Sequence, residues 1–119
     1  MNGLPIFGLI LALAMSPRAW AHAFLDHSTP AVGSQVRGSP ASVSLWFTDE
    51  LEPAFSSIKV FDAQGKEVDA GDTAALSNDR TALKVSLRRL GPGTYKVVWR
   101  VLSVDTHVTE GNFGFTVLP

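Results

Sequence analysis

Residues 93–117, GTYKVVWRVLSVDTHVTEGNFGFTV, carry the strongest indication of the fold. Its first part alternates apolar with polar residues, and the same alternation recurs in shorter segments at 42–48, 57–62, 81–87 and 112–118. Val, Ile, Phe, Trp and Thr favour strands, and an alternation of period two indicates a strand with one buried face. Turn residues at 63–66 and 91–93 separate these segments. The pattern therefore predicts an all-β domain.

The amino-terminal segment has a different character. An apolar run, LPIFGLILALAM, occupies residues 4–15, and a short polar break leads to Ala19, Trp20 and Ala21. This is the hydrophobic region and the A-x-A cleavage site of a secretory signal peptide, and the run is shorter than the roughly 20 residues that span a bilayer. We expect residues 1–21 to be removed, which leaves 119 − 21 = 98 residues. The mature part, 22–119, is predicted to be one exported domain that does not insert into a membrane.

About seven short strands in a domain of this size are typical of an antiparallel sandwich or barrel with Greek-key connections. No segment keeps an apolar period of 3.6, which would indicate a helix. The most polar stretch, 69–80, is predicted to be a solvated connection without chemistry of its own. We assign the large aromatic residues first to the core; they are Trp46, Trp99, Phe113 and Phe115.

Charge and sulfur content exclude several classes of function. The chain has 10 Lys and Arg against 11 Asp and Glu, and loss of Arg18 leaves 10 − 1 = 9 basic residues. A net charge near −2 provides no basic field for nucleic acid. The chain has no Cys, and its two methionines, Met1 and Met15, both lie in the segment that we expect to be removed. The mature domain therefore lacks the sulfur ligands that Cu(I) selects and the Cys thiolate of a blue-copper electron carrier.

Cleavage after Ala21 would make His22 the first residue, so that its free α-amine and its ring Nδ1 could bind one metal ion together. Asp105 and His107 are two residues apart, and in an extended backbone their side chains would project from the same face. Three nitrogens and one oxygen form a ligand set suited to Cu(II). Each feature alone has a simpler explanation, a frayed terminal histidine or a surface Asp bonded to a His. Their combination favours a copper site.

The chain also resembles the CopC-type periplasmic copper-resistance proteins over the whole mature domain. Three motifs carry the resemblance: HAFLDHSTPAVGS at 22–34, VSLWFTDELEPAFSSIKVFDAQGK at 43–66, and the stretch at 93–117. The resemblance implies a periplasmic, seven-stranded Greek-key sandwich or barrel related to cupredoxins. It also implies that Cu(II) is held by an N-terminal histidine brace, in which the amine and ring of one His bind the metal together, completed by an Asp and a second His. These roles fall on His22, Asp105 and His107.

The resemblance carries two further implications. In some members a Glu approaches the copper from further away, and Asp49 occupies the matching position, either as a group that supports a ligand or as a plain surface carboxylate. Members also work beside a CopD-type membrane protein that is thought to move copper inward, and here such a partner would be a separate chain. Certain members carry a Met-rich Cu(I) site that this chain lacks. Together with the missing sulfur ligands, this leads us to expect a monomeric Cu(II) binder for sequestration, transport or resistance rather than an enzyme.

Other interpretations stay open at this point. His27 could add a ligand, although a solvated loop histidine is the favoured interpretation. A histidine brace is also the copper site of oxidative polysaccharide-cleaving monooxygenases, which are typically larger proteins. A metal-free sandwich that serves only as an interaction module is the third class of function.

Overall fold

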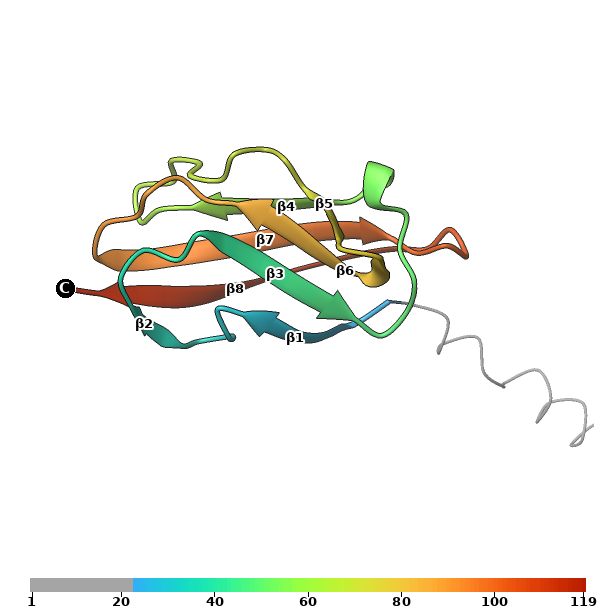
Figure 1. Cartoon of the computed structure of the whole chain (residues 1–119), viewed down its shortest axis with the longest axis horizontal. Coiled ribbons are helices and arrows are strands. Elements are labelled where there is room, and N and C mark those ends of the chain that lie inside the picture. Colours follow the sequence, from blue (N-terminus) through green and yellow to red (C-terminus); the bar gives the residue numbers. More distant parts are fainter. Residues whose placement is uncertain (1–22) are drawn as a thin grey trace, which may run out of the picture.

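A computed structural model describes residues 23–119 of the chain. The expected signal peptide and His22 lie outside these residues. Within them the chain forms two four-stranded sheets that pack face to face, with one short 3-10 helix, Pro53–Phe55 (Figure 1). No helix in this described part is long and apolar enough to cross a membrane.

The two sheets divide the strands in a Greek-key arrangement, so that consecutive strands often lie in different sheets. The first sheet has the order β1-β3-β6-β5, and its strands are Leu25–Thr29, Ser42–Phe47, Asp79–Ser86 and Ala74–Leu76. The second has the order β2-β8-β7-β4, and its strands are Gln35–Arg37, Val108–Leu118, Gly93–Leu102 and Ser57–Phe61. The predicted all-β Greek-key sandwich is confirmed.

The hairpin of β7 and β8 is the longest paired unit and determines where the candidate site lies. Ten residue pairs connect the two strands, from Gly93 opposite Val117 to Leu102 opposite Val108. Along β7 every second residue is buried, from Tyr95 to Val101, as the alternation predicts. The hairpin closes at its far end with the turn 103–107, which contains Asp105 and His107.

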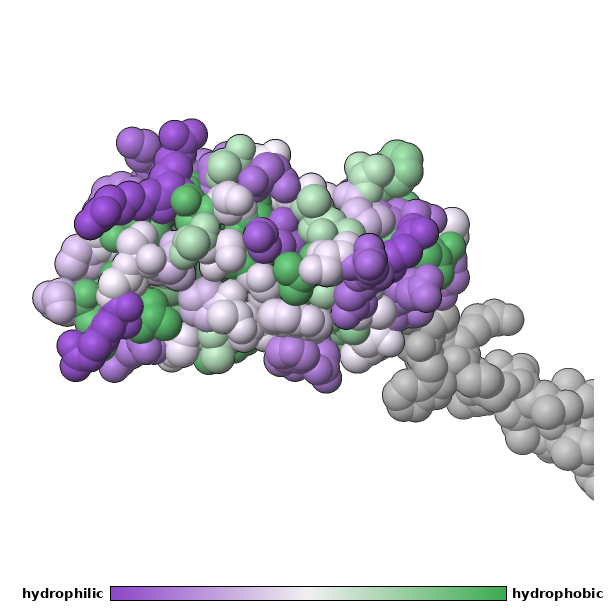
Figure 2. All heavy atoms as spheres, viewed as in Figure 1, coloured by the Kyte–Doolittle hydropathy of each residue, from purple (hydrophilic) through white to green (hydrophobic). Residues whose placement is uncertain are grey.

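Large apolar side chains from both sheets fill the space between them. The fully buried ones include Leu45, Leu83, Val97 and Phe115. Trp99 also faces inward, with its ring edge-on to Phe47 at 5.2 Å between centroids. The same indole covers Gly111, where a Cβ atom would lie 2.4 Å from the ring. Because only glycine leaves that space, Gly111 allows the largest aromatic side chain to enter the core. The face shown in Figure 2 is mostly hydrophilic or neutral, with apolar residues in small separate groups.

Several strand predictions need correction. The segment 69–80 is not a simple solvated connection, because it contains β5 and the start of β6. Asp69 is buried there, and its carboxylate accepts a hydrogen bond from the Val60 N–H, 2.8 Å away. This bond satisfies a backbone donor on the outer edge of β4, where the Val68 N–H also donates to the Val60 carbonyl. The polar sequence of the segment gave no sign of this contact. Strand β2 pairs with β8 in parallel, so the sandwich is not wholly antiparallel.

Two aromatic assignments also differ from the prediction. Trp99, Phe113 and Phe115 are core residues, but Trp46 is only partly buried and lies on the outer face of its sheet. His27 is exposed, as predicted, but it belongs to strand β1 rather than to a loop, and its ring stacks on Trp46. Side chains alternate between the two faces of β3, so Trp46 lies on the other face from its buried neighbours Leu45 and Phe47. Its position follows from this alternation rather than from its hydrophobicity.

Candidate metal centre

Three segments that are far apart in sequence meet at one end of the sandwich. They are the start of the described chain at 23–24, the loop 48–51 after β3, and the turn 103–107 between β7 and β8. In Figure 1 the hairpin turn and the start of β1 both lie at the right-hand end. The backbone N–H of Val104 donates to the Glu50 carbonyl at 3.0 Å, and Leu51 pairs with Ser103. The turn is therefore attached directly to the loop after β3.

Ser103 organises the turn from a fully buried position. Its backbone N–H donates to the His107 carbonyl at 2.9 Å, which closes the turn. Its hydroxyl accepts the His107 N–H at 3.3 Å and donates to Oδ1 of Asp105. Thr106 takes the left-handed conformation, with φ at 70°, that the reversal requires. One buried hydroxyl thus fixes both residues that the sequence predicts as ligands.

The side chains of Asp105 and His107 lie next to each other, with 3.3 Å between Oδ1 and Nδ1. Both are partly open to solvent, at 36% and 47% exposure. The hydrogen bond from Ser103, and to a lesser degree the one from His107, holds the pKa of Asp105 below its ordinary value. Asp105 is therefore a carboxylate, the form that binds metal, at neutral and mildly acidic pH.

The start of the described chain is fixed beside this turn. Ala23 is fully buried, and its carbonyl accepts a hydrogen bond from the Thr109 hydroxyl at 2.8 Å. Thr109 is the second residue after His107 and lies on the first rungs of β8. Two hydrogen bonds of 2.9 Å join Phe24 to Thr48. The Phe24 N–H donates to the Thr48 hydroxyl, and the Thr48 N–H donates to the Phe24 carbonyl. The residue that follows His22 in sequence is thus held between both sheets, close to the predicted ligands.

Asp49 lies in the loop 48–51, between Thr48 and Glu50, and is partly buried. Its carboxylate accepts the N–H of Glu50 at 2.8 Å. The neighbouring residues of this loop contact both Phe24 and the turn 103–107, which places Asp49 in the same end of the domain. Its proposed support of the metal centre stays a prediction.

The structure brings Asp105 and His107 together for a different reason from the predicted one. The segment is a turn rather than extended backbone, and β8 begins at Val108, four residues before the predicted start. The side chains of Ser103, Thr109 and Thr48 hold these segments together, and the sequence analysis did not single them out. Serine and threonine near strand ends are a weak sequence signal, because they commonly bond to any nearby backbone.

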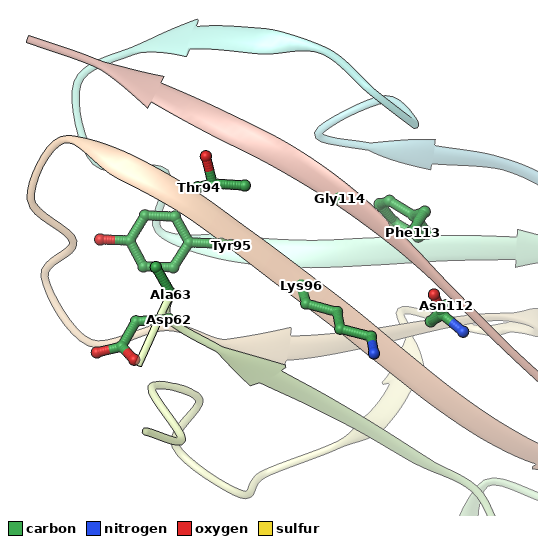
Figure 3. A pocket seen from close by; sticks show the side chains of 8 residues that line it. All are labelled: Asp62, Ala63, Thr94, Tyr95, Lys96, Asn112, Phe113 and Gly114. Atoms are coloured by element: carbon green, nitrogen blue, oxygen red, sulfur yellow. The ribbon is translucent and has the colours of Figure 1, made fainter. Parts of the chain in front are cut away.

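Two further observations on residues 23–119 concern where a ligand could bind. This part of the chain contains no group of three or more His, Cys, Asp or Glu residues placed to hold a metal ion. A shallow depression of about 400 Å³ lies elsewhere, over the start of β7, the middle of β8 and the turn that follows β4 (Figure 3). Lys96, in its wall, is seven residues from Ser103 along β7, or roughly 20 Å at strand spacing. The depression is therefore separate from the candidate centre.

Comparisons with known proteins agree on one family. The CopC domain matches residues 25–118. "Protein YobA" of Escherichia coli K12 is 36% identical over 104 residues, covering 87% of this chain and 84% of that protein. "Copper resistance protein C" of Escherichia coli is 32% identical over 117 residues, covering 92% and 90%. "Copper transport protein CutJ" of Bacillus subtilis is 30% identical over 92% of this chain, which spans only 20% of that protein.

Solved structures give the same result. The crystal structure of CopC from Methylosinus trichosporium OB3b has a TM-score of 0.78 and 38% identity, covering 82% of this chain and 95% of that one. PcoC, described as a methionine-rich copper resistance protein from Escherichia coli, has a TM-score of 0.73 and 34% identity, covering 82% and 99%.

Proposed function

Because this chain belongs to the CopC family, we propose that it is a periplasmic protein that binds one Cu(II) ion for sequestration, transport or resistance. The ligands are the amine and ring of His22, the carboxylate of Asp105 and the imidazole of His107. The observation that carries the proposal is the Asp105–His107 pair, held in one turn by the buried Ser103. Both groups are of the kinds that Cu(II) prefers.

In this proposal the remaining two donors are the amine and ring of His22, which lies outside the described residues. Asp105 and His107 are two donors, and residues 23–119 contain no larger cluster. A peptide bond joins His22 to Ala23, so the two Cα atoms are about 3.8 Å apart. Since Ala23 is fixed through Thr109 near His107, a terminal amine and ring at position 22 would be within reach of the pair. This arrangement supports the histidine brace.

Ligand chemistry supports Cu(II) over Cu(I). The described residues contain neither Cys nor Met, whereas the structurally similar PcoC is described as methionine-rich. Nitrogen and carboxylate oxygen suit Cu(II), and thioether or thiolate sulfur suits Cu(I). Nothing in the site provides a reason to propose catalysis, and the relatives are described by copper resistance and copper transport.

The proposed partner is a separate membrane protein of the CopD type. In "Copper transport protein CutJ" the segment similar to this chain makes up about one fifth of the polypeptide. A CopC-like domain can therefore be one part of a larger transport protein. We propose that here the domain acts as a separate monomer and exchanges copper with that partner.

A direct titration tests the proposed function. Protein purified from the periplasm of its host, with its amino terminus verified by mass spectrometry, is titrated with Cu(II) buffered by glycine. We expect a high-affinity event at one ion per chain and an electron paramagnetic resonance spectrum with several nitrogen donors in a tetragonal field. A spectrum that shows only oxygen donors, or no high-affinity event at all, would contradict the proposal.

Thr109→Val is expected to weaken Cu(II) binding by about three- to tenfold without a change in fold. The substitution removes the hydroxyl that fixes the Ala23 carbonyl, a hydrogen bond of about 0.5–1.5 kcal/mol. The amine and ring of His22 are then less well ordered before copper binds, and ordering them on binding lowers the Cu(II) affinity. Thr116→Val, the same change at the other end of β8, is the control and should leave the Cu(II) dissociation constant unchanged. Equal affinities for the two variants would mean that Thr109 does not position the site.

A further inference from the structure

A second group of potential copper ligands lies on β1, an edge strand of the first sheet. Nδ1 of His27 is 2.6 Å from Oδ2 of Asp26, and the two side chains are 57% and 63% exposed. Consecutive residues of a regular strand point to opposite faces. Here the register of β1 against β3 shifts between Leu25 and His27, so Asp26 occupies an irregularity in the strand. Such a bulge re-aims side chains and explains how the two neighbours meet.

Trp46 holds the imidazole of His27 in one orientation. It is the residue opposite His27 on β3, and the two rings are stacked with 4.5 Å between centroids and 8° between planes. Trp46 covers one face of the imidazole, while Nδ1 on the edge of the ring contacts the Asp26 carboxylate. A ring that is already ordered loses less conformational entropy when it binds a ligand.

We propose that Asp26 and His27 form a second, weaker Cu(II) site on the edge of the first sheet. Adjacent positions of a tetragonal ion with bonds of about 2.0 Å are about 2.8 Å apart, close to the observed separation of the two donor atoms. Copper would bind Nδ1 of the neutral ring in the tautomer that carries its single proton on Nε2; a ring protonated on both nitrogens would first release the Nδ1 proton to solvent. Water molecules would complete the coordination, because both side chains are open to solvent.

This site differs from the copper site proposed above at His22, Asp105 and His107, here called the main centre. The two sites differ in the number of protein donors and in the groups that copper binding needs. The Asp26–His27 site has two protein donors, where the main centre would have four, so we expect its affinity for Cu(II) to be lower by at least about tenfold. It requires neither the free terminal amine nor His107. Copper bound at Asp26 and His27 would exchange readily with external ligands. Strand β1, which carries these two residues, directly follows the segment that starts at Ala23.

The experiment is a Cu(II) titration continued beyond one equivalent, followed by tryptophan fluorescence and electron paramagnetic resonance. Wild-type protein should bind a second ion, and this ion should quench the fluorescence of Trp46. In Trp46→Phe this second quenching step should be absent. His27→Phe keeps an aromatic ring against Trp46 but lacks the nitrogen, and Asp26→Asn lacks the charge; both should bind only the first ion. Glu110→Gln, which changes an exposed acid on the other sheet, is the control and should bind both.

The outcomes separate this site from the main centre. His107→Ala should weaken the tight event by more than about 100-fold and leave binding of the second ion, with its quenching of Trp46, unchanged. If His27→Phe, shown to be folded by circular dichroism, binds the second ion as wild type does, the Asp26–His27 site is wrong. A wild-type protein that binds a single ion throughout a titration to millimolar copper would overturn it as well, while leaving the proposed function intact.

Discussion

A form of the protein with one extra residue ahead of His22 is expected to bind Cu(II) at least about 100-fold more weakly than the form that begins at His22. The extra residue converts the α-amine into an amide, which is no longer a basic donor at neutral pH, and so opens the chelate ring formed by amine and imidazole. Even groups that only orient a metal ligand typically change metal affinity by about 10- to 100-fold. Loss of a direct donor, together with its chelate ring, should therefore exceed that range.

The measurement is a competition titration of both forms against a Cu(II) chelator of known affinity. A form with one residue added after Pro119 is the matched control, because it changes the length of the chain equally at the other terminus. Circular dichroism should be the same for all three forms, since the rest of the sandwich does not depend on the added residue. Equal Cu(II) affinity of the extended and authentic forms would exclude the brace.

Replacement of the paired ligands is the second large effect that we expect. His107→Ala should lower the Cu(II) affinity by more than about 100-fold, and Asp105→Asn by a similar factor. The turn itself should survive, because the hydrogen bond from the Ser103 N–H to the carbonyl of residue 107 involves only backbone atoms. The asparagine can still accept a hydrogen bond from the Ser103 hydroxyl, so this variant isolates the loss of the carboxylate charge.

Both variants and the double variant are compared with wild type by the same competition titration. If the two groups bind one ion, their effects will be non-additive, because removing the second ligand of a broken site costs less than removing the first. Glu110→Gln, a nearby acid on β8, controls for the general loss of negative charge and should have an affinity within about twofold of wild type. A variant of either residue that keeps the wild-type spectrum and affinity would show that it is no ligand.

Local sequence predicted the fold well wherever strands alternate. The inward faces of β3, β4, β7 and the end of β8 match the buried residues, because period two separates the two faces of a strand without reference to any neighbour. The same rule failed where pairing depends on distant partners. Strands β2 and β5 have three residues each, and neither is recognisable until β8 and β6 lie beside it.

The candidate site shows the same division. The sequence selects Asp105 and His107 by their chemistry, but the extended backbone assumed for them is wrong, and the turn is held by Ser103. Asp26 and His27 are neighbours in sequence, yet a regular strand would separate their side chains. The bulge that brings them together, and the stack on Trp46, depend on the pairing of β1 with β3.

Residue types and local spacing are enough to assign the all-β class and the CopC family, and to show that no sulfur ligand follows Met15. The anchoring of Ala23 by Thr109, 86 residues later, beside the turn that holds Asp105 and His107 emerges only when the chain is folded. A hydrogen bond or a pair of ligands acts over about 3 Å in space, and the number of residues between two groups does not predict whether they lie that close.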